Sequence, residues 1–286
     1  MKIIKYFIES LFIIFLLIVF KILGLKFSSN LGSIVGGLLG PFFRSKNTII
    51  SNIKKALPEA EQKDIEIITK KMWKNYGRIL SEYVFIKNFR NSKDEKFFSV
   101  EGQEILNGIK NTNEPVIFIS GHFNNFELMA MQIEKSGINL AAIYRPLNNV
   151  FLNKIMERIR KKYICQKQIK KGISGTRELL ESFKKNYSIA LMIDQRVSEG
   201  IKSDFFGQPA LTTTVPAQLV RKFGCKIVPV YIERIKSTFF KIKISKPIIY
   251  NKDSSIEEIT LDLNKWLEKM ILNNPSQWIW SHDRWK

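Results

Sequence analysis

Between residues 97 and 244, short apolar segments rich in β-branched residues alternate with longer amphipathic segments. The short segments have the pattern of buried strands, whereas the longer ones repeat apolar residues at three- and four-residue steps, which is typical of helices. Strands that alternate with helices predict βαβ units and therefore an α/β fold, in which helices cover a sheet. The predicted strands are 97–100, 115–120, 140–144, 188–193, 226–234 and 239–244, the last two as a possible hairpin, and the predicted helices are 104–110, 126–136, 150–162, 176–185, 216–223 and 256–272.

The N-terminal segment is apolar from Tyr6 to Leu25, which is about the length that a helix needs to cross a bilayer. Glu9 and Lys21 would lie near its edges, where a long lysine side chain can reach the headgroups. A cleaved signal peptide would need a small-residue cleavage site after the apolar run, and only a weak one follows. A buried core helix is a less natural role for so continuous an apolar run. We therefore predict a retained membrane anchor.

A second apolar patch, residues 31–43, contains several glycines and Pro41, which argue against another simple membrane span. We expect this patch to lie in the membrane interface, or to pack its small residues against the first helix. Arg44 and Lys46 mark the return to water, and residues 47–91 then show a helical pattern. The predicted organisation is an N-terminal membrane anchor and interfacial segment over residues 1–46, followed by one domain over residues 47–286.

The chain is strongly basic, because 46 lysines and arginines face 26 aspartates and glutamates and the net charge is +20. Such an excess attracts anions, for example nucleic acid, acidic lipid headgroups or an acidic protein. A dense run of basic residues is usually a solvated face of a protein, although it can also dock an acidic protein or an anionic lipid. No recognised nucleic-acid-binding motif is present, so no nucleic acid partner is expected. The densest basic run consists of Arg158, Arg160, Lys161, Lys162, Lys167, Lys170 and Lys171.

The chain has two histidines, His122 and His282, and histidine is the usual proton carrier near neutral pH. His122 directly follows a predicted buried strand and precedes a predicted helix, which is where α/β sheets place reactive groups. Glu127 could turn back onto the imidazole and hold one ring nitrogen as N–H, leaving the other to accept a proton from an alcohol. The alternative is a histidine that only caps its own helix. His282 lies among tryptophans and is interpreted as a packed, hydrogen-bonded core residue.

The sequence carries no pattern for a metal or a nucleotide cofactor. The cysteines, Cys165 and Cys225, belong to no zinc-binding or disulfide pattern. A phosphate-binding Gly-rich loop, a dinucleotide fingerprint and the nucleophile elbow of serine hydrolases are absent as well. We therefore expect a site that works without a metal and without a cofactor.

Several motifs occur along the chain in a characteristic order. Residues 121–127, Gly-His-Phe-Asn-Asn-Phe-Glu, resemble the His-x4-Asp/Glu motif of glycerolipid and lipid A acyltransferases. Further segments are similar to blocks of the late acyltransferases of lipid A assembly, the lauroyl and myristoyl transferases and their relatives. These segments are residues 52–58, Tyr144-Arg145-Pro146, Met192-Ile-Asp-Gln-Arg196, Phe205-Phe-Gly-Gln-Pro-Ala-Leu-Thr212 and Pro275-Ser-Gln-Trp-Ile-Trp-Ser-His-Asp-Arg-Trp285. The resemblance covers nearly the whole chain.

The resemblance implies a mixed sheet flanked by helices behind a membrane-anchoring helix, in the bacterial inner membrane, with the domain facing the cytoplasm. It implies an O-acyltransferase that moves a fatty acyl chain from acyl carrier protein to a hydroxyl of a lipid A precursor. His122 would be the general base and Glu127 its partner. Arg145 would contact a lipid phosphate or the developing oxyanion, and Asp194 would orient Arg145 or His122. The alternative for Arg145 and Asp194 is a structural ion pair.

The resemblance also implies substrate-binding residues outside this group. In the segment 205–212, the glycine and the proline would shape a turn, and Thr212 would cap the following helix. The segment as a whole would build the site or contact substrate. The expected substrate-binding residues are Arg196, Phe206, Gly207, Pro209 and Thr212.

Two other functions stay open at the level of sequence. An enzyme of the same mechanism could acylate a lysophospholipid, an aminolipid or another glycolipid, because the His-x4-Glu core does not distinguish acceptors. A non-enzymatic basic protein that binds a membrane surface or nucleic acid is compatible with the net charge. That alternative leaves the pairing of a histidine at a strand end with a nearby carboxylate unexplained.

Overall fold

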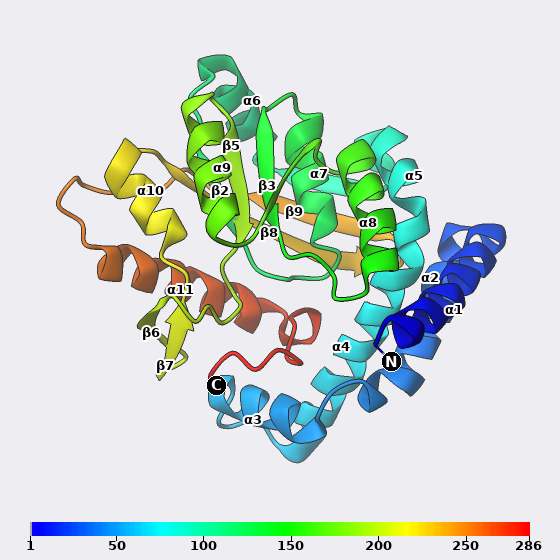
Figure 1. Ribbon diagram of the computed structural model, residues 1–286. Coiled ribbons are helices and arrows are strands. Elements are labelled where there is room, and N and C mark those ends of the chain that lie inside the picture. The colour runs from blue at the N-terminus through cyan, green and yellow to red at the C-terminus, as the bar shows by residue number, and fades with distance from the viewer. Residues whose placement is uncertain (1) are drawn as a thin grey trace.

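The computed structural model describes residues 2–286 and shows a seven-stranded sheet with helices on both faces (Figure 1). The strands lie in the order β1-β9-β8-β2-β5-β3-β4, and every neighbouring pair is parallel except β8 and β9. The predicted α/β fold with a mixed sheet is confirmed. The strands are β1 (Phe98–Glu101), β2 (Ile117–Ser120), β3 (Leu140–Tyr144), β4 (Lys167–Lys170), β5 (Ser188–Met192), β8 (Ile227–Lys236) and β9 (Phe239–Ile244).

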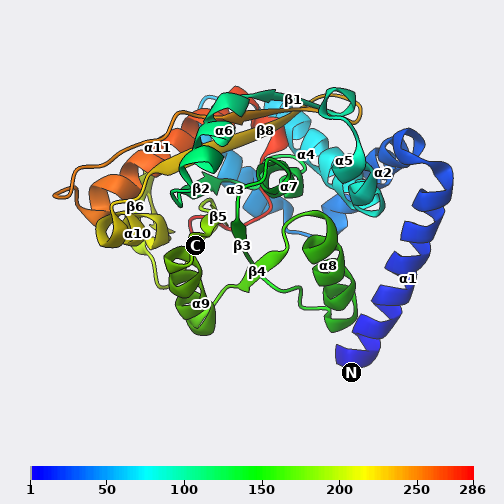
Figure 2. The ribbon, with the colours of Figure 1, turned by 90° about the horizontal axis from the view of Figure 1, so that it is seen from above.

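The helices divide between the two faces of the sheet, as Figure 2 shows. On one face, Ser120 of β2 contacts Met129, and the Tyr144 hydroxyl of β3 hydrogen-bonds Glu157 at 2.5 Å. These contacts place α7 (Glu127–Lys135) and α8 (Val150–Tyr163) over that face. The other face carries α9 (Ile173–Lys184) and α10 (Val215–Phe223), which meet through the rings of Phe183 and Phe223. The sheet is therefore buried from both sides, which explains why its strands are almost continuously apolar.

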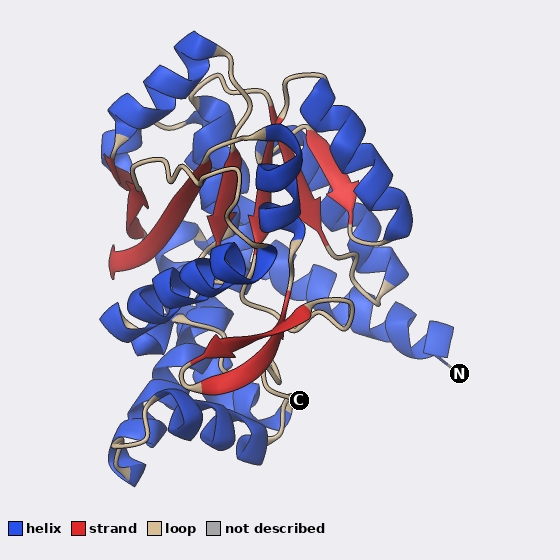
Figure 3. Cartoon of the chain, turned by 90° about the vertical axis from the view of Figure 1, so that its left-hand side faces the viewer, coloured by secondary structure: helices blue, strands red, loops and turns tan. Residues whose placement is uncertain are grey.

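Most of the remaining helices lie at the edges of the sheet or below the carboxyl ends of its central strands, whereas α6 (Gln103–Thr112) lies near the amino ends of those strands (Figures 1 and 3). The C-terminal segment also runs below the carboxyl ends (Figure 1). The other helices are α3 (Lys46–Ala56), α4 (Gln62–Glu82), α5 (Ile86–Asn91) and α11 (Ile256–Asn273). Every helix and strand predicted from the sequence between residues 97 and 272 is present within a few residues of its expected bounds.

Sequence reasoning missed three strands, and each has a physical reason. Strand β4 reads Lys-Gln-Ile-Lys and lies at the edge of the sheet, so it lacks the apolar run of a buried strand. Strands β6 (Ile201–Phe205) and β7 (Gln208–Thr212) form a separate two-stranded hairpin, whereas the sequence predicts only a turn in the segment 205–212. The turn at Phe206 and Gly207 has positive φ at both residues, 55° and 70°, as a two-residue hairpin turn requires.

The N-terminus forms two helices, α1 (Lys2–Leu23) and α2 (Leu25–Leu39). Helix α1 is long and apolar enough to cross a membrane and is mostly exposed, which is compatible with the predicted anchor. Met1, the first residue of that prediction, lies outside the described residues. Of the two alternatives for residues 31–43, packing of the small residues against the first helix is not what the glycines show. Gly32 and Gly36 of α2 face Gly77 of α4, and Gly40, which follows α2, faces Trp73 of α4.

This glycine contact between α2 and α4 predicts a change in stability. A Cβ at Gly36 would lie 2.7 Å from the Cα of Gly77, and backbone atoms cannot move aside as a side chain can. We expect Gly36→Ala to lower the free energy of unfolding by about 1–3 kcal/mol, measured by denaturant unfolding in detergent. Gly37→Ala is the matched control, because its Cβ would meet only the flexible side chain of Lys74, at 3.1 Å. Equal losses for both variants would contradict a tight glycine contact.

Candidate active site

His122 and Asp194 lie side by side because β2 and β5 are parallel neighbours in register. Ser120 is paired with Met192 at the ends of these strands, so the residues two positions further on meet at the carboxyl edge of the sheet. His122 Nδ1 lies 2.8 Å from Asp194 Oδ1, and the backbone N–H of His122 donates to Oδ2 at 2.7 Å. The pair stands at a sheet edge where α/β folds commonly place ligands.

Asp194 is fully buried and holds the imidazole in one orientation. The indole N–H of Trp278 donates to its second oxygen at 2.9 Å. Burial alone would raise the pKa of Asp194, but the charge of His122 and the hydrogen bonds from His122 and Trp278 outweigh it, so the pKa lies below its usual value. The carboxylate therefore stays charged and accepts a hydrogen bond from the Nδ1–H group of His122. In the neutral tautomer that donates from Nδ1, Nε2 of His122 carries no proton, and the side chain is 18% exposed.

Glu127 does not hold His122, so the predicted pairing of these two residues is wrong in its geometry. Glu127 Oε1 accepts from Arg160 Nε at 2.8 Å and also pairs with Arg160 Nη2. Both side chains are almost fully buried, and Arg160 comes from α8, 33 positions away from Glu127. Glu127 begins α7, and its side chain is directed toward α8. Of the two residues that Asp194 was predicted to orient, the structure places His122 in hydrogen-bond contact with it.

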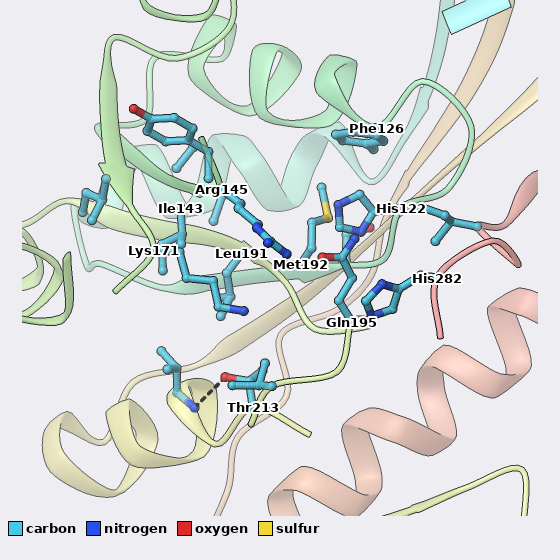
Figure 4. A pocket seen from close by; sticks show the side chains of 18 of the residues that line it. His122, Phe126, Ile143, Arg145, Lys171, Leu191, Met192, Gln195, Thr213 and His282 are labelled. Atoms are coloured by element: carbon cyan, nitrogen blue, oxygen red, sulfur yellow. Dashed lines mark hydrogen bonds between the residues drawn. The ribbon is translucent and has the colours of Figure 1, made fainter. Parts of the chain in front are cut away.

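A cavity of about 1080 Å³ opens at the carboxyl edge of the strands and contains His122 on its wall (Figure 4). Glu127, Arg145, Arg160 and Arg196 also line it. Figure 4 shows the Arg145 side chain extending from the end of β3 toward Met192 and His122. The structure therefore gathers all the predicted catalytic residues in one region, with Asp194 directly behind His122.

Four of the five predicted substrate-binding residues lie elsewhere. The β6–β7 hairpin contains Phe206, Gly207, Pro209 and Thr212, and none of these four is among the described residues that line the cavity. The fifth residue, Arg196, does line it. Thr212 does not cap a helix either. Its hydroxyl accepts from Arg284 Nη2 at 2.6 Å and from Asn264 Nδ2 at 3.3 Å, so it ties the hairpin to the C-terminus and to α11.

The C-terminal segment completes the site, and sequence reasoning did not assign Trp278 to it. Asn52 of α3 donates to the carbonyls of Trp280 at 2.9 Å and His282 at 2.7 Å, which fixes the segment below the sheet. His282 lines the cavity, and its Nε2 accepts from the backbone N–H of Arg196 at 3.0 Å. Burial lowers the pKa of His282, in keeping with a neutral ring that accepts this bond. The predicted hydrogen bonding of His282 is confirmed, but its placement in the core is wrong, because the side chain is only half-buried and lines the cavity.

Glu82, at the end of α4, is a second residue that sequence reasoning missed. It is completely buried and accepts two hydrogen bonds from the guanidinium of Arg234 of β8, at 2.6 and 2.9 Å. Its oxygens also accept from Ser29 of α2 at 2.7 Å and from Asn125 at 3.0 Å. One carboxylate thus links the N-terminal helices to the loop that carries His122. Only a signal of long-range pairing, which one sequence does not contain, could have revealed it.

Comparison with known proteins agrees with this site. A family profile described as "Bacterial lipid A biosynthesis acyltransferase" matches residues 1–286. The chain is 23% identical over 261 residues to the lipid A biosynthesis palmitoleoyltransferase of Escherichia coli (strain K12), covering 90% of this chain and 84% of that protein. It is 23% identical over 267 residues to the lipid A biosynthesis lauroyltransferase of the same organism, with coverage of 90% and 84%. It is also 24% identical over 253 residues to lipid A biosynthesis acyltransferase 2 of Shigella flexneri, covering 85% of this chain and 78% of that protein.

The motifs, the fold and the full-length match lead to one conclusion: the chain belongs to the family of bacterial lipid A biosynthesis acyltransferases.

Proposed function

We propose that this acyltransferase moves a fatty acyl chain from an acyl carrier protein thioester to a hydroxyl of a lipid A precursor, with His122 as the general base. The observation that carries this proposal is the hydrogen bond of 2.8 Å between His122 Nδ1 and the buried Asp194 carboxylate, on the wall of a large cavity. Nε2 removes the proton of the acceptor hydroxyl as its oxygen attacks the thioester carbonyl carbon. The tetrahedral intermediate collapses with cleavage of the C–S bond, and the thiolate takes the proton from the imidazolium.

Glu127 acts in this proposal through Arg160 rather than through His122. The buried carboxylate holds the guanidinium at the cavity wall, and both residues line the same cavity as His122. A buried guanidinium fixed in this way is a preorganised positive charge, and such charges stabilise the oxyanion of acyl transfer. Glu127 therefore remains essential to the site, as a residue that positions Arg160.

An apolar slot between the sheet and the helices α7 and α8 fits a fatty acyl chain. Ala142 and Ala190 are neighbours in register on this face of the sheet, and both are partly exposed to the cavity although they lie in inner strands. The small alanines leave free space above the sheet. Ala130 and Ile133 of α7 form the opposite wall. We define these four residues as the apolar slot, and we assign the acyl chain of the donor to it.

Narrowing the apolar slot should change the preferred length of the donor chain. Ala190→Leu places extra carbon atoms in the middle of the slot and displaces the end of a long chain. If two methylenes lose their burial, at about 0.8 kcal/mol each, kcat/KM for long-chain donors falls roughly tenfold relative to short-chain donors. A series of acyl carrier protein thioesters of increasing length measures this ratio. Ala130→Leu narrows the slot from the facing helix and should give the same shift. An equal loss for all chain lengths would contradict the assignment.

The surface around the cavity supports the proposed partners. Helix α1 exposes large apolar side chains along most of its length, including Phe7, Leu11 and Phe15, and such a surface is stable in a bilayer. We propose that it anchors the enzyme in the bacterial inner membrane, with the cavity on the cytoplasmic side. Arg158 and Lys161 lie on α8, the helix that also carries the buried Arg160. Their positive charge suits a docking site for the acidic acyl carrier protein.

A parallel transfer assay tests this function. Membranes that contain the protein receive labelled acyl carrier protein thioesters, with a tetra-acylated lipid A precursor and a lysophospholipid as separate acceptors. Transfer to the precursor alone supports the proposal. Transfer to the lysophospholipid alone would keep the mechanism but assign the enzyme to another acceptor. Coenzyme A thioesters run beside the carrier protein thioesters decide the donor. Activity with coenzyme A thioesters alone would contradict the proposed donor.

A further inference from the structure

The cavity has a second apolar wall, on the opposite face of the sheet from the apolar slot. Side chains alternate along a strand, so Ile143 and Leu191 point away from the face that carries their neighbours Ala142 and Ala190. Ile143 pairs in register with Ile169, whose side chain lies against Gly175 of α9. The second wall therefore faces α9. Figure 4 shows the same division, because Met192 lies toward Phe126 whereas Leu191 lies toward Lys171 and Thr213.

This second wall continues into a groove, and all the residues that form the groove line the same cavity as His122. Leu179 and Thr176 contribute the side of the groove that α9 forms, and Thr213 and Val215 contribute the side that precedes and begins α10. We call this region the α9 groove, defined by Ile143, Thr176, Leu179, Leu191, Thr213 and Val215. The apolar slot and the α9 groove thus lie on opposite faces of the sheet and meet at its carboxyl edge, beside His122.

The charges at the two regions differ. On the side of the apolar slot the cations have carboxylate partners, since Arg160 pairs with Glu127 and Lys170 lies 3.6 Å from Glu157. Lys171 and Arg145 line the cavity beside the α9 groove, and neither forms a salt bridge with a side chain that the structure describes. Burial and the charge of Arg145 lower the pKa of Lys171, and the charge of Glu199 opposes them. Two cations that line one cavity without a salt-bridge partner favour the binding of an anionic group there.

We infer that the α9 groove is the acceptor subsite, which holds a fatty chain of the acceptor lipid while Lys171 and Arg145 bind its phosphate. This inference rests on the proposed function and adds where the acceptor lies. The donor chain and the acceptor chain enter from opposite faces of the sheet, so the two substrates do not compete for one apolar channel. The hydroxyl and the thioester then meet at the sheet edge, next to Nε2 of His122. Phosphate and chain together select an anionic lipid.

Kinetics with the two substrates varied separately test this subsite. Thr176 is an exposed residue of α9 at the groove, so Thr176→Trp fills the groove without disturbing the core. We expect the acceptor KM to rise about tenfold, since burial of roughly two methylenes is lost, while the donor KM and the donor chain-length preference stay unchanged. Ser174→Trp is the matched control, because Ser174 is exposed on the same helix and does not line the cavity. It should leave both KM values unchanged.

The phosphate contact is tested with Lys171→Gln and two acceptors, the phosphorylated precursor and its dephosphorylated form. Loss of one charge-assisted hydrogen bond should raise the KM of the phosphorylated acceptor roughly tenfold and leave that of the dephosphorylated acceptor unchanged. An increase of the donor KM instead, in either the tryptophan or the glutamine variant, would overturn the inference. So would unchanged kinetics in both. Wild-type enzyme that transfers to no lipid acceptor would overturn the proposed function itself, which keeps the two failures distinct.

Discussion

His122→Ala should lower kcat/KM for acyl transfer by roughly 10²–10⁴, the usual contribution of a general base. The variant removes the nitrogen that takes the acceptor proton, and the described residues that line the cavity offer one other imidazole, that of His282. Nε2 of His282 already accepts a hydrogen bond from Arg196 N at 3.0 Å, so it cannot replace the base without losing that contact. The measurement is initial-rate transfer at saturating donor with the lipid A precursor as acceptor.

The chain offers a matched control for this variant in its other histidine. His282→Gln keeps a side-chain acceptor for the N–H of Arg196 and leaves the His122–Asp194 pair intact. We expect a loss of at most about tenfold, in line with one weakened hydrogen bond. Thermal unfolding of both variants should match the wild-type protein within a few degrees. If His122→Ala retains more than about a tenth of the wild-type rate, His122 is not the general base.

Asp194→Asn should cause a second large loss, of about 10²–10⁴ in kcat, because the orientation and the tautomer of His122 both depend on this carboxylate. The carboxylate accepts from Nδ1, from the His122 backbone N–H and from Trp278 at the same time. An amide has only one oxygen, so it satisfies part of this set and offers N–H where an acceptor is needed. The acceptor KM should change little, since Asp194 is completely buried behind the cavity wall.

Trp278→Phe separates the charge of Asp194 from its hydrogen bonding. It removes one donor to Oδ2 and leaves the contact of 2.8 Å between Nδ1 and Oδ1 unchanged. We expect a reduction of no more than about tenfold in kcat. The hydrogen bond from Trp278 helps to hold the pKa of Asp194 below its usual value, so the charged carboxylate stabilises the fold until acid protonates it. Without that bond the pKa rises, and acid unfolding should begin at a higher pH in Trp278→Phe than in the wild type. Identical kcat for Asp194→Asn and wild type would show that another group orients the imidazole.

Much of the fold could be predicted from the sequence because the signals are local. Apolar runs such as residues 115–120 and 188–193 reveal buried strands, and the three- and four-residue spacing of apolar side chains reveals the helices between them. The β6–β7 hairpin and β4 escaped this reasoning, since their strands are short, polar and poorly buried on one side. A strand that packs against another element carries apolar residues that can be recognised in the sequence. Strands β4, β6 and β7 are less buried, so they lack this signal.

For the site, the sequence determined that His122 stands at a strand end and that Asp194 stands at another. It did not determine which carboxylate holds the imidazole. Proximity along the chain favoured Glu127, yet the first turn of α7 directs that side chain toward Arg160 on α8. Asp194, 72 positions away, reaches His122 because β2 and β5 pair in parallel register. Likewise, the opposite faces of the sheet that carry the apolar slot and the α9 groove exist only once the strands are side by side. The periodicity of a helix or a strand depends on residues that are neighbours along the chain, so the sequence alone reveals it. Strand order and register depend on contacts between residues far apart in the sequence, so only the tertiary structure decided how the site is assembled.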